Sequence, residues 1–313
     1  MDNVVIVPGA NSEKCSIQVH WRLAGEIPQQ EFDDALQRAG VPQRLLPSPP
    51  GDAVVLKRAM VAVKSGNRDL VRALNHKGGF SLVHEDPEAL DLELEELENS
   101  PKNAHKVALT AKVERRADCV QPVFSPPDHP LVSLVTAEFN RQRGVYNCST
   151  DLSVWLTQKI IPYCNGLSGR ERGGFYYIPE GESVKRFQQM EEIVSSFSLM
   201  RQTGSQSKLL NGIKFYKVPV MSTPDAVEAI IDSLVDECDK VCDEIGERLD
   251  DHHSGKKEFR NRGIAKVQTQ AKNIKKKVEL YSNLLGDSLD DLKDRIDEVS
   301  GAITNVDLHQ VSI

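Results

Sequence analysis

The carboxyl-terminal part of the chain carries the sequence pattern that most narrows its possible folds. Apolar side chains recur at intervals of three and four residues in one long stretch, and again in a second stretch after a polar break at residues 250–255. Such spacing places one apolar stripe along each of two helices. Gly286 interrupts the second stripe, and a short helix restarts at Ser288. Residues 223–304 are therefore predicted to form an antiparallel coiled-coil hairpin.

The two stripes supply the residues that we expect in the seam of this hairpin. The first helix contributes Ile231 and Leu234, and the second contributes Ile264, Val267, Ile274, Val278, Tyr281 and Leu285. Two stripes bury little surface by themselves, so the hairpin must either dock on its own globular domain or pair with another copy. Self-association is the favoured interpretation, and it predicts a homo-oligomer.

Charge is segregated between the same two helices. Residues 225–251 hold eleven acidic side chains against Lys240 and Arg248, whereas residues 256–277 hold nine basic side chains against Glu258. Folding one helix onto the other lets these charges offset each other along the flanks of the seam. Because an exposed pair contributes only about 0.3–0.5 kcal/mol, the seam should supply most of the stability and the charges should set the direction of pairing.

The chain as a whole is predicted to be α+β, with an α+β domain over residues 1–125. A period of two indicates a half-buried strand at residues 16–23, whose apolar positions are Ile17, Val19, Trp21 and Leu23. Helices are predicted at residues 28–40 and 52–63, and strands at residues 70–74, 80–84, 90–97 and 106–114. Acids alternate with leucines on the third of these strands, and lysines alternate with apolar residues on the fourth. Pairing the two would bury both apolar faces and set opposite charges side by side.

A proline-rich stretch at residues 125–130 looks like a linker to a middle domain at residues 128–220. The expected order there is a helix at residues 131–143, a second helix capped by Ser149 or Thr150, and a hairpin with a basic tip. This is the order of a winged helix. A helix at residues 183–196 and a strand at residues 213–220 complete the predicted unit.

Nucleic acid is the alternative partner suggested by this winged-helix-like unit. Arg170 and Arg172 at the predicted tip, with Arg141 and Arg143 on the preceding helix, could contact a phosphate backbone, but a solvated tip beside an ordinary helix end is favoured. The aromatic run at residues 175–177 could stack on bases, although such a run is more often a buried strand. The lysine-rich helix is expected to pair with the acidic one. A net charge of −7 argues against a surface wholly dedicated to nucleic acid and is compatible with a local basic patch.

No metal site, cofactor site or catalytic motif is expected. Cys238 and Cys242 near His252 and His253 superficially resemble a metal site, but both cysteines fall on the apolar stripe. The six dispersed cysteines indicate reduced thiols. No export signal or membrane-spanning stretch is recognisable. We therefore expect a cytoplasmic protein without a membrane partner.

A resemblance is carried by Ser149-Thr150-Asp151-Leu152, by Gly173-Gly174-Phe175-Tyr176-Tyr177-Ile178-Pro179 and by the coiled-coil tail. In these residues the chain resembles a family of uncharacterised proteins of bacteria, archaea and their phages. The resemblance implies a recurring architecture and an association with prokaryotes or mobile elements, but no activity. The leading functional hypothesis is a non-enzymatic oligomeric interaction or scaffold protein. The alternative is a nucleic-acid-binding accessory or regulatory protein.

Overall fold

The computed structural model of the chain has two compact units. It describes residues 13–64, 69–73, 79–85, 105–116, 119–170, 174–199, 212–254, 261–286 and 289–310. Unit 1 combines Met1–Leu23 with Leu156–Ile313, and unit 2 is Ala24–Trp155. The mixture of helices and antiparallel sheets confirms the predicted α+β class.

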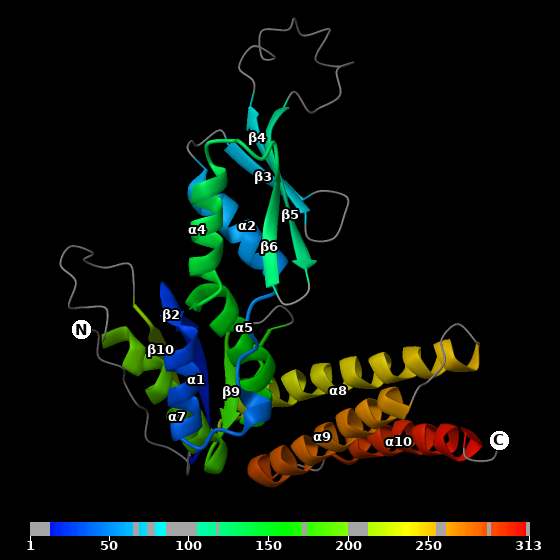
Figure 1. The fold of residues 1–313 in the computed structure, drawn as a ribbon. Coiled ribbons are helices and arrows are strands. Elements are labelled where there is room, and N and C mark those ends of the chain that lie inside the picture. Colours follow the sequence, from blue (N-terminus) through cyan, green and yellow to red (C-terminus); the bar gives the residue numbers. More distant parts are fainter. Residues whose placement is uncertain are drawn as a thin grey trace, which may run out of the picture. The chain divides into compact units, whose positions relative to one another are not determined.

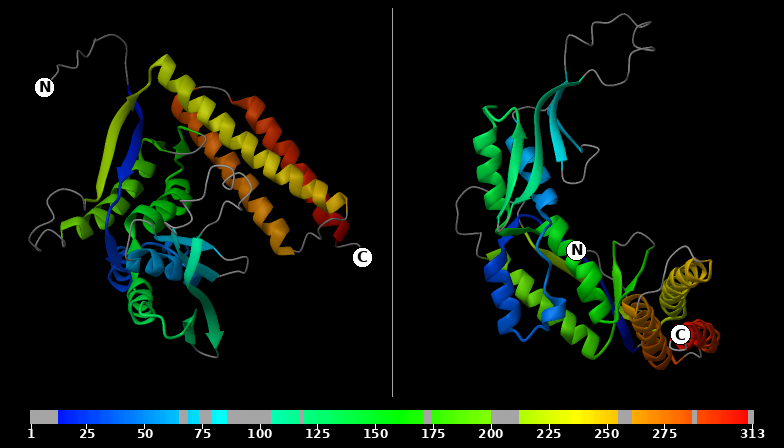
Figure 2. Two further views of the ribbon diagram at one scale, coloured as in Figure 1. Left: turned by 90° about the horizontal axis from the view of Figure 1, so that it is seen from above. Right: turned by 45° about the vertical axis from the view of Figure 1, so that its right-hand side comes forward.

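Unit 1 is built on a four-stranded antiparallel sheet with the order β10-β1-β9-β8. The strands are β1 (Lys14–Arg22), β8 (Leu167–Ser168), β9 (Tyr176–Pro179) and β10 (Lys214–Met221). The predicted strand near the amino terminus therefore pairs with a strand about two hundred residues further along the chain, and Figure 2 shows these two strands side by side. Residues 128–220, predicted as one domain, are consequently divided between the two units after Trp155.

One face of this sheet is buried beneath helices of unit 1. Ile17 and Val19 of β1 and Ile178 of β9 are all buried there. Phe187 of α7 (Glu182–Leu199) packs edge-on against Phe215 of β10. The hydroxyl of Thr157, in η4 (Leu156–Ile160), shares a hydrogen bond with the hydroxyl of Tyr176 on the same face, and α6 (Ile161–Tyr163) follows η4 directly.

Three long helices follow the sheet in unit 1, and they lie side by side (Figure 1). They are α8 (Pro224–His253), α9 (Asn261–Leu285) and α10 (Asp290–Gln310). α8 and α9 occupy the positions of the predicted hairpin. The segment predicted as a short restarted helix is instead a 21-residue helix that contacts both of the others. Ile296 and Ile303 of α10, together with Leu289 just before it, join the cores that α8 and α9 form, so the three helices make a bundle.

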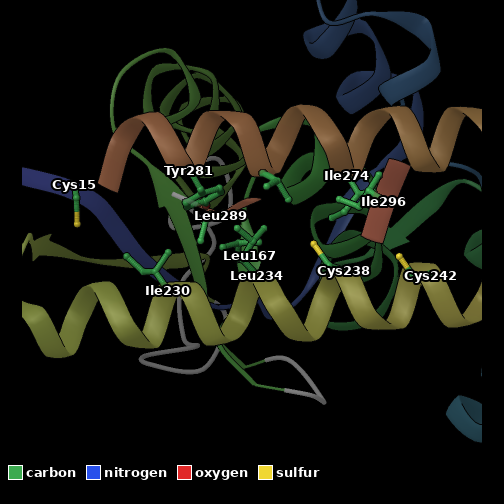
Figure 3. Close-up of a cluster of buried hydrophobic side chains, with 11 residues drawn as sticks. Cys15, Leu167, Ile230, Leu234, Cys238, Cys242, Ile274, Tyr281, Leu289 and Ile296 are labelled. Atoms are coloured by element: carbon green, nitrogen blue, oxygen red, sulfur yellow. The ribbon is translucent and has the colours of Figure 1, made fainter. Parts of the chain in front are cut away.

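The base of the bundle shares one hydrophobic core with the sheet. Side chains from all three helices meet Cys15 of β1 and Leu167 of β8, and Figure 3 shows this cluster between α8 and α9. Tyr177 and Val220 pack against it from the sheet. A second core, which includes Leu249 and Val267, fills the other end of the bundle with residues of the helices alone.

Unit 2 packs two helices on a second antiparallel sheet of order β3-β4-β5-β6. The strands are β3 (Asp69–Ala73), β4 (Gly79–Glu85), β5 (His105–Arg116) and β6 (Cys119–Ser125). The covering helices are α2 (Asp52–Val63) and α4 (Val132–Gln142). Leu56 and Met60 of α2 and Phe139 of α4 share the core with Leu109 of β5. The predicted linker therefore joins a strand and a helix of one core.

Smaller elements complete unit 2. They are β2 (Glu26–Pro28), α1 (Gln29–Arg38), η1 (Gln43–Leu45), β7 (Val145–Asn147), η3 (Cys148–Leu152) and α5 (Ser153–Trp155). The cap of the helix predicted to begin at Ser149 or Thr150 is Asn147, whose side chain accepts a hydrogen bond from the amide of Thr150. The predicted strand at residues 90–97 lies outside the described residues, and β5 pairs with β4 and β6. Among the helices that the structure describes, none is long and apolar enough to cross a membrane.

Candidate functional site

The predicted seam residues meet inside a single chain. Leu234, Ile264, Val267, Ile274, Val278 and Tyr281 are buried, and Ile231 and Leu285 are partly buried against the same core. The sequence left two alternatives, docking on the chain's own globular domain or pairing with another copy. In the structure the hairpin docks on the sheet of its own chain. The apolar stripes of α8 and α9 motivated the prediction of self-association, and α10 and the sheet cover them.

Two side chains of α9 fix the bundle to the sheet by polar contacts. The buried ammonium of Lys277 donates to Glu237 Oε1 at 2.6 Å and to the backbone oxygen of Gly166 at 3.0 Å. The hydroxyl of Tyr281, one helical turn later, lies 3.0 Å from the backbone oxygen of Asn165. Burial raises the pKa of Tyr281 well above its ordinary value. These contacts position the loop that leads into β8.

Ion pairs between the helices match the predicted charge segregation. Lys277 pairs with Glu237 of α8, and Lys275 of α9 pairs with Asp297 of α10. Arg295 of α10 pairs with Asp239 of α8. The basic helix therefore has acidic neighbours on both α8 and α10.

The four arginines predicted to contact nucleic acid are described unit by unit. In unit 2, Arg141 is held by Glu26 and Glu138, and its hydrogen bond lowers the pKa of the Glu138 carboxyl. Arg143 lies over the ring of Phe139, with Asp52 at 3.5 Å. Arg170 belongs to unit 1 and is exposed, whereas Arg172 lies outside the described residues.

Two other residues that the sequence singled out, Cys238 and Asp151, contribute to the core and to a contact between helices. Cys238 lies in the core beneath α9, and burial raises the pKa of its thiol to about 12. The side chains of His252 and His253 lie outside the described part of the chain. Asp151, from the motif that carries the family resemblance, accepts two hydrogen bonds from Arg58 of α2 at 2.6 and 2.7 Å. This pair connects two helices of unit 2.

An open area on the second face of the unit 1 sheet is a candidate site that the sequence did not reveal. The cross-strand pairs of β1 and β10 on this face are Ser16 with Val220, Gln18 with Val218, His20 with Tyr216 and Arg22 with Lys214. Val220 packs against the core at the base of the bundle. Further along the strands the bundle no longer covers the face, because Val218 is 50% exposed and Tyr216 is 42% exposed.

The rings and the cations on this open face are adjacent. The rings of His20 and Tyr216 are stacked, with centroids 4.6 Å apart and planes 6° from parallel. Arg22 and Lys214 are directly opposite each other at the next position on the same face, and both are exposed. Like charges placed opposite each other in a sheet are destabilising. In the described part of the chain, neither cation has a carboxylate partner.

A second aromatic and cationic pair lies on the hairpin of β8 and β9. The ring of Phe175 packs edge-on against Tyr177, which shares the face of Gln18. The guanidinium of Arg170 lies 5.4 Å from the centre of the Phe175 ring. Gly169 makes room for that ring, because a Cβ at this position would come within 1.9 Å of it. Phe175 is thus held by its neighbours, whereas Tyr216 is not covered to the same extent.

The open sheet face and the bundle define the class of this protein: a two-unit α+β protein with an aromatic and cationic sheet face in unit 1. The chain belongs to a family of unknown function, DUF6744, whose model matches residues 21–310. This match agrees with the resemblance to uncharacterised proteins. No curated protein and no solved structure matches the chain significantly.

Proposed function

We propose that the protein is a non-enzymatic nucleic-acid-binding protein whose sheet in unit 1 provides the binding face. The stacked rings of His20 and Tyr216 beside the cations Arg22 and Lys214 carry this proposal. Aromatic rings that stack on bases, combined with cations that contact phosphates, are the usual components of a nucleic-acid-binding surface. A like-charged pair without a carboxylate partner, in the part of the chain that is described, suits an anionic ligand.

Nucleic-acid binding, the alternative suggested by the sequence, therefore replaces self-association as our leading hypothesis. Self-association was favoured because the helical hairpin needed a partner, and α10 with the sheet supplies one. The exposed edge of β10 is also a poor surface for pairing two copies, since Lys217 and Pro219 lie within it. Lysine and proline are the residues by which edge strands avoid pairing with each other.

Fluorescence anisotropy of labelled single-stranded and duplex oligonucleotides at low ionic strength tests the proposal. The double variant Arg22→Glu/Lys214→Glu should weaken binding by about tenfold or more, because it replaces two phosphate contacts by repulsion. The matched control is Lys266→Glu/Lys276→Glu. It makes the same change in net charge on exposed positions of α9.

The control should retain most of the affinity. Absence of binding by the wild-type protein would refute the proposal. An equal loss from both double variants would also count against the sheet face, because it would reflect total charge rather than position.

A further inference from the structure

We infer that the ligand is single-stranded and that one of its bases stacks on the outer face of Tyr216, at the edge of the sheet. This inference rests on the proposed function and narrows it to a ligand class and a contact. Three observations support the inference: β10 is an edge strand, the ring of Phe175 is already in contact with its neighbours, and Arg22 and Lys214 lie close to Tyr216.

The stack of His20 and Tyr216 has an open end. In a cross-strand pair with parallel rings, one face of Tyr216 is covered by His20 and the other points away from β1. β10 is the edge strand of this sheet, and among the residues that the structure describes no further strand lies on that side. The exposure of Tyr216 agrees with this geometry. A flat ligand ring placed there would extend the stack from two rings to three.

An unpaired base fits that position, whereas a base in the interior of a duplex does not. In a duplex each base is covered by its neighbours above and below, so a protein ring has access to base edges but not to base faces. In a single strand the bases can separate, and stacking on an aromatic side chain is then worth about 1–3 kcal/mol per base. The exposed side chain of Val218 offers an adjacent apolar contact.

The cations lie within reach of the phosphates that flank such a base. Arg22 and Lys214 are each two residues from the stacked rings along their strands. At about 3.3 Å per residue this places their backbones about 7 Å from the rings, a separation that long side chains span.

The ring of Phe175, by contrast, is already in contact with Arg170 and Tyr177. One base at Tyr216 is therefore the contact to which we commit.

The test compares Tyr216→Ala and Tyr216→Leu with Tyr216→Phe in the full-length protein. The probes are a single-stranded DNA and an RNA of the same sequence, each carrying one 2-aminopurine, and the corresponding duplexes. The fluorescence of 2-aminopurine falls when it stacks, so it reports the contact independently of affinity. The leucine variant keeps apolar bulk at the sheet edge without a ring, so it guards against a folding defect in the alanine variant.

Wild type and Tyr216→Phe should bind either single strand more tightly than its duplex and should quench the probe. Both variants without a ring should lose the quenching and bind single strands about tenfold or more weakly. If duplex and single strand bind equally, or if a folded ringless variant still quenches the probe, the inference is wrong and the proposed function survives through its charges. If the wild-type protein binds no probe, the proposed function itself fails.

Discussion

The hydroxyl of Tyr281 provides the sharpest test of how the bundle is fixed to the sheet. Tyr281→Phe keeps the buried ring and removes only the oxygen that lies 3.0 Å from the backbone oxygen of Asn165 and 3.4 Å from that of Tyr177. A net hydrogen bond contributes about 1 kcal/mol, and an acceptor left unpaired in the interior adds about 1–3 kcal/mol. Because Asn165 is only partly buried, water can reach its carbonyl. We therefore expect a loss of about 1–2 kcal/mol.

Urea unfolding followed by far-ultraviolet circular dichroism measures this loss at neutral pH. The control is Tyr216→Phe, which removes an exposed hydroxyl from the same unit and should change stability by less than about 0.5 kcal/mol. A Tyr281→Phe variant as stable as the wild type would refute the reasoning, because the buried hydroxyl would then contribute nothing to docking.

The difference in stability between the wild type and Tyr281→Phe should also depend on pH. Burial raises the pKa of Tyr281 in the folded state above its value in the unfolded chain. Its contribution is therefore complete below the unfolded pKa of about 10 and is lost as pH rises toward the folded value. Above pH 10 the wild type should lose about 1.4 kcal/mol per pH unit relative to Tyr281→Phe, which cannot ionise. A stability difference that stays constant with pH would contradict this.

Three further substitutions test other contacts by urea unfolding. Lys277→Met should lower the free energy of unfolding by about 1–2 kcal/mol, because Glu237 is 34% exposed and water can solvate it when its partner is removed. Unchanged stability would mean that the ion pair contributes nothing. Gly169→Ala should cost about 1–3 kcal/mol, since its methyl group would displace the ring of Phe175, and retention of that ring position in a crystal structure would contradict the explanation. Gly246→Ala should instead stabilise by about 0.5–1 kcal/mol, because the position is helical and open, so destabilisation there would reveal an unrecognised contact.

Local patterns predicted most of the helices and several strands. The apolar stripe that begins after Pro224 predicted α8, and the alternation of apolar and polar residues at 106–114 predicted β5. The hairpin of β3 and β4 also lies where turn residues between two apolar runs indicated it. In each of these elements the periodicity of the side chains and the conformation of the backbone agree, and the information needed lies within a few residues.

Long-range pairing could not be predicted in the same way. A period of two identified β1 as a strand, but nothing in that pattern specifies β10 as its neighbour. The contribution of α10 was underestimated for a related reason, because its stripe shows an apolar face but not which surface that face covers. The division of the chain into units follows from these contacts between distant segments.

The candidate face was missed because its residues look ordinary in the sequence. Gln18, His20 and Arg22 are the polar positions of an alternating strand, and such positions are normally solvated. They become notable only when β10 places Tyr216 and Lys214 opposite them. The two arginines predicted in unit 2, by contrast, stood out in the sequence as cations, and the structure places carboxylates beside both side chains.

The bundle also bears on where a polyanion can approach unit 1. By sequence, α8 holds eleven carboxylates against two cations and α10 holds six against two, whereas α9 holds one against six. Because α9 contacts both acidic helices and shares ion pairs with them, its lysines lie in a field that carboxylates offset. Arg22 and Lys214 have no such partner in the described residues. The proposed function therefore predicts that a polyanion is attracted to the open sheet face and repelled by the acidic helices of the bundle.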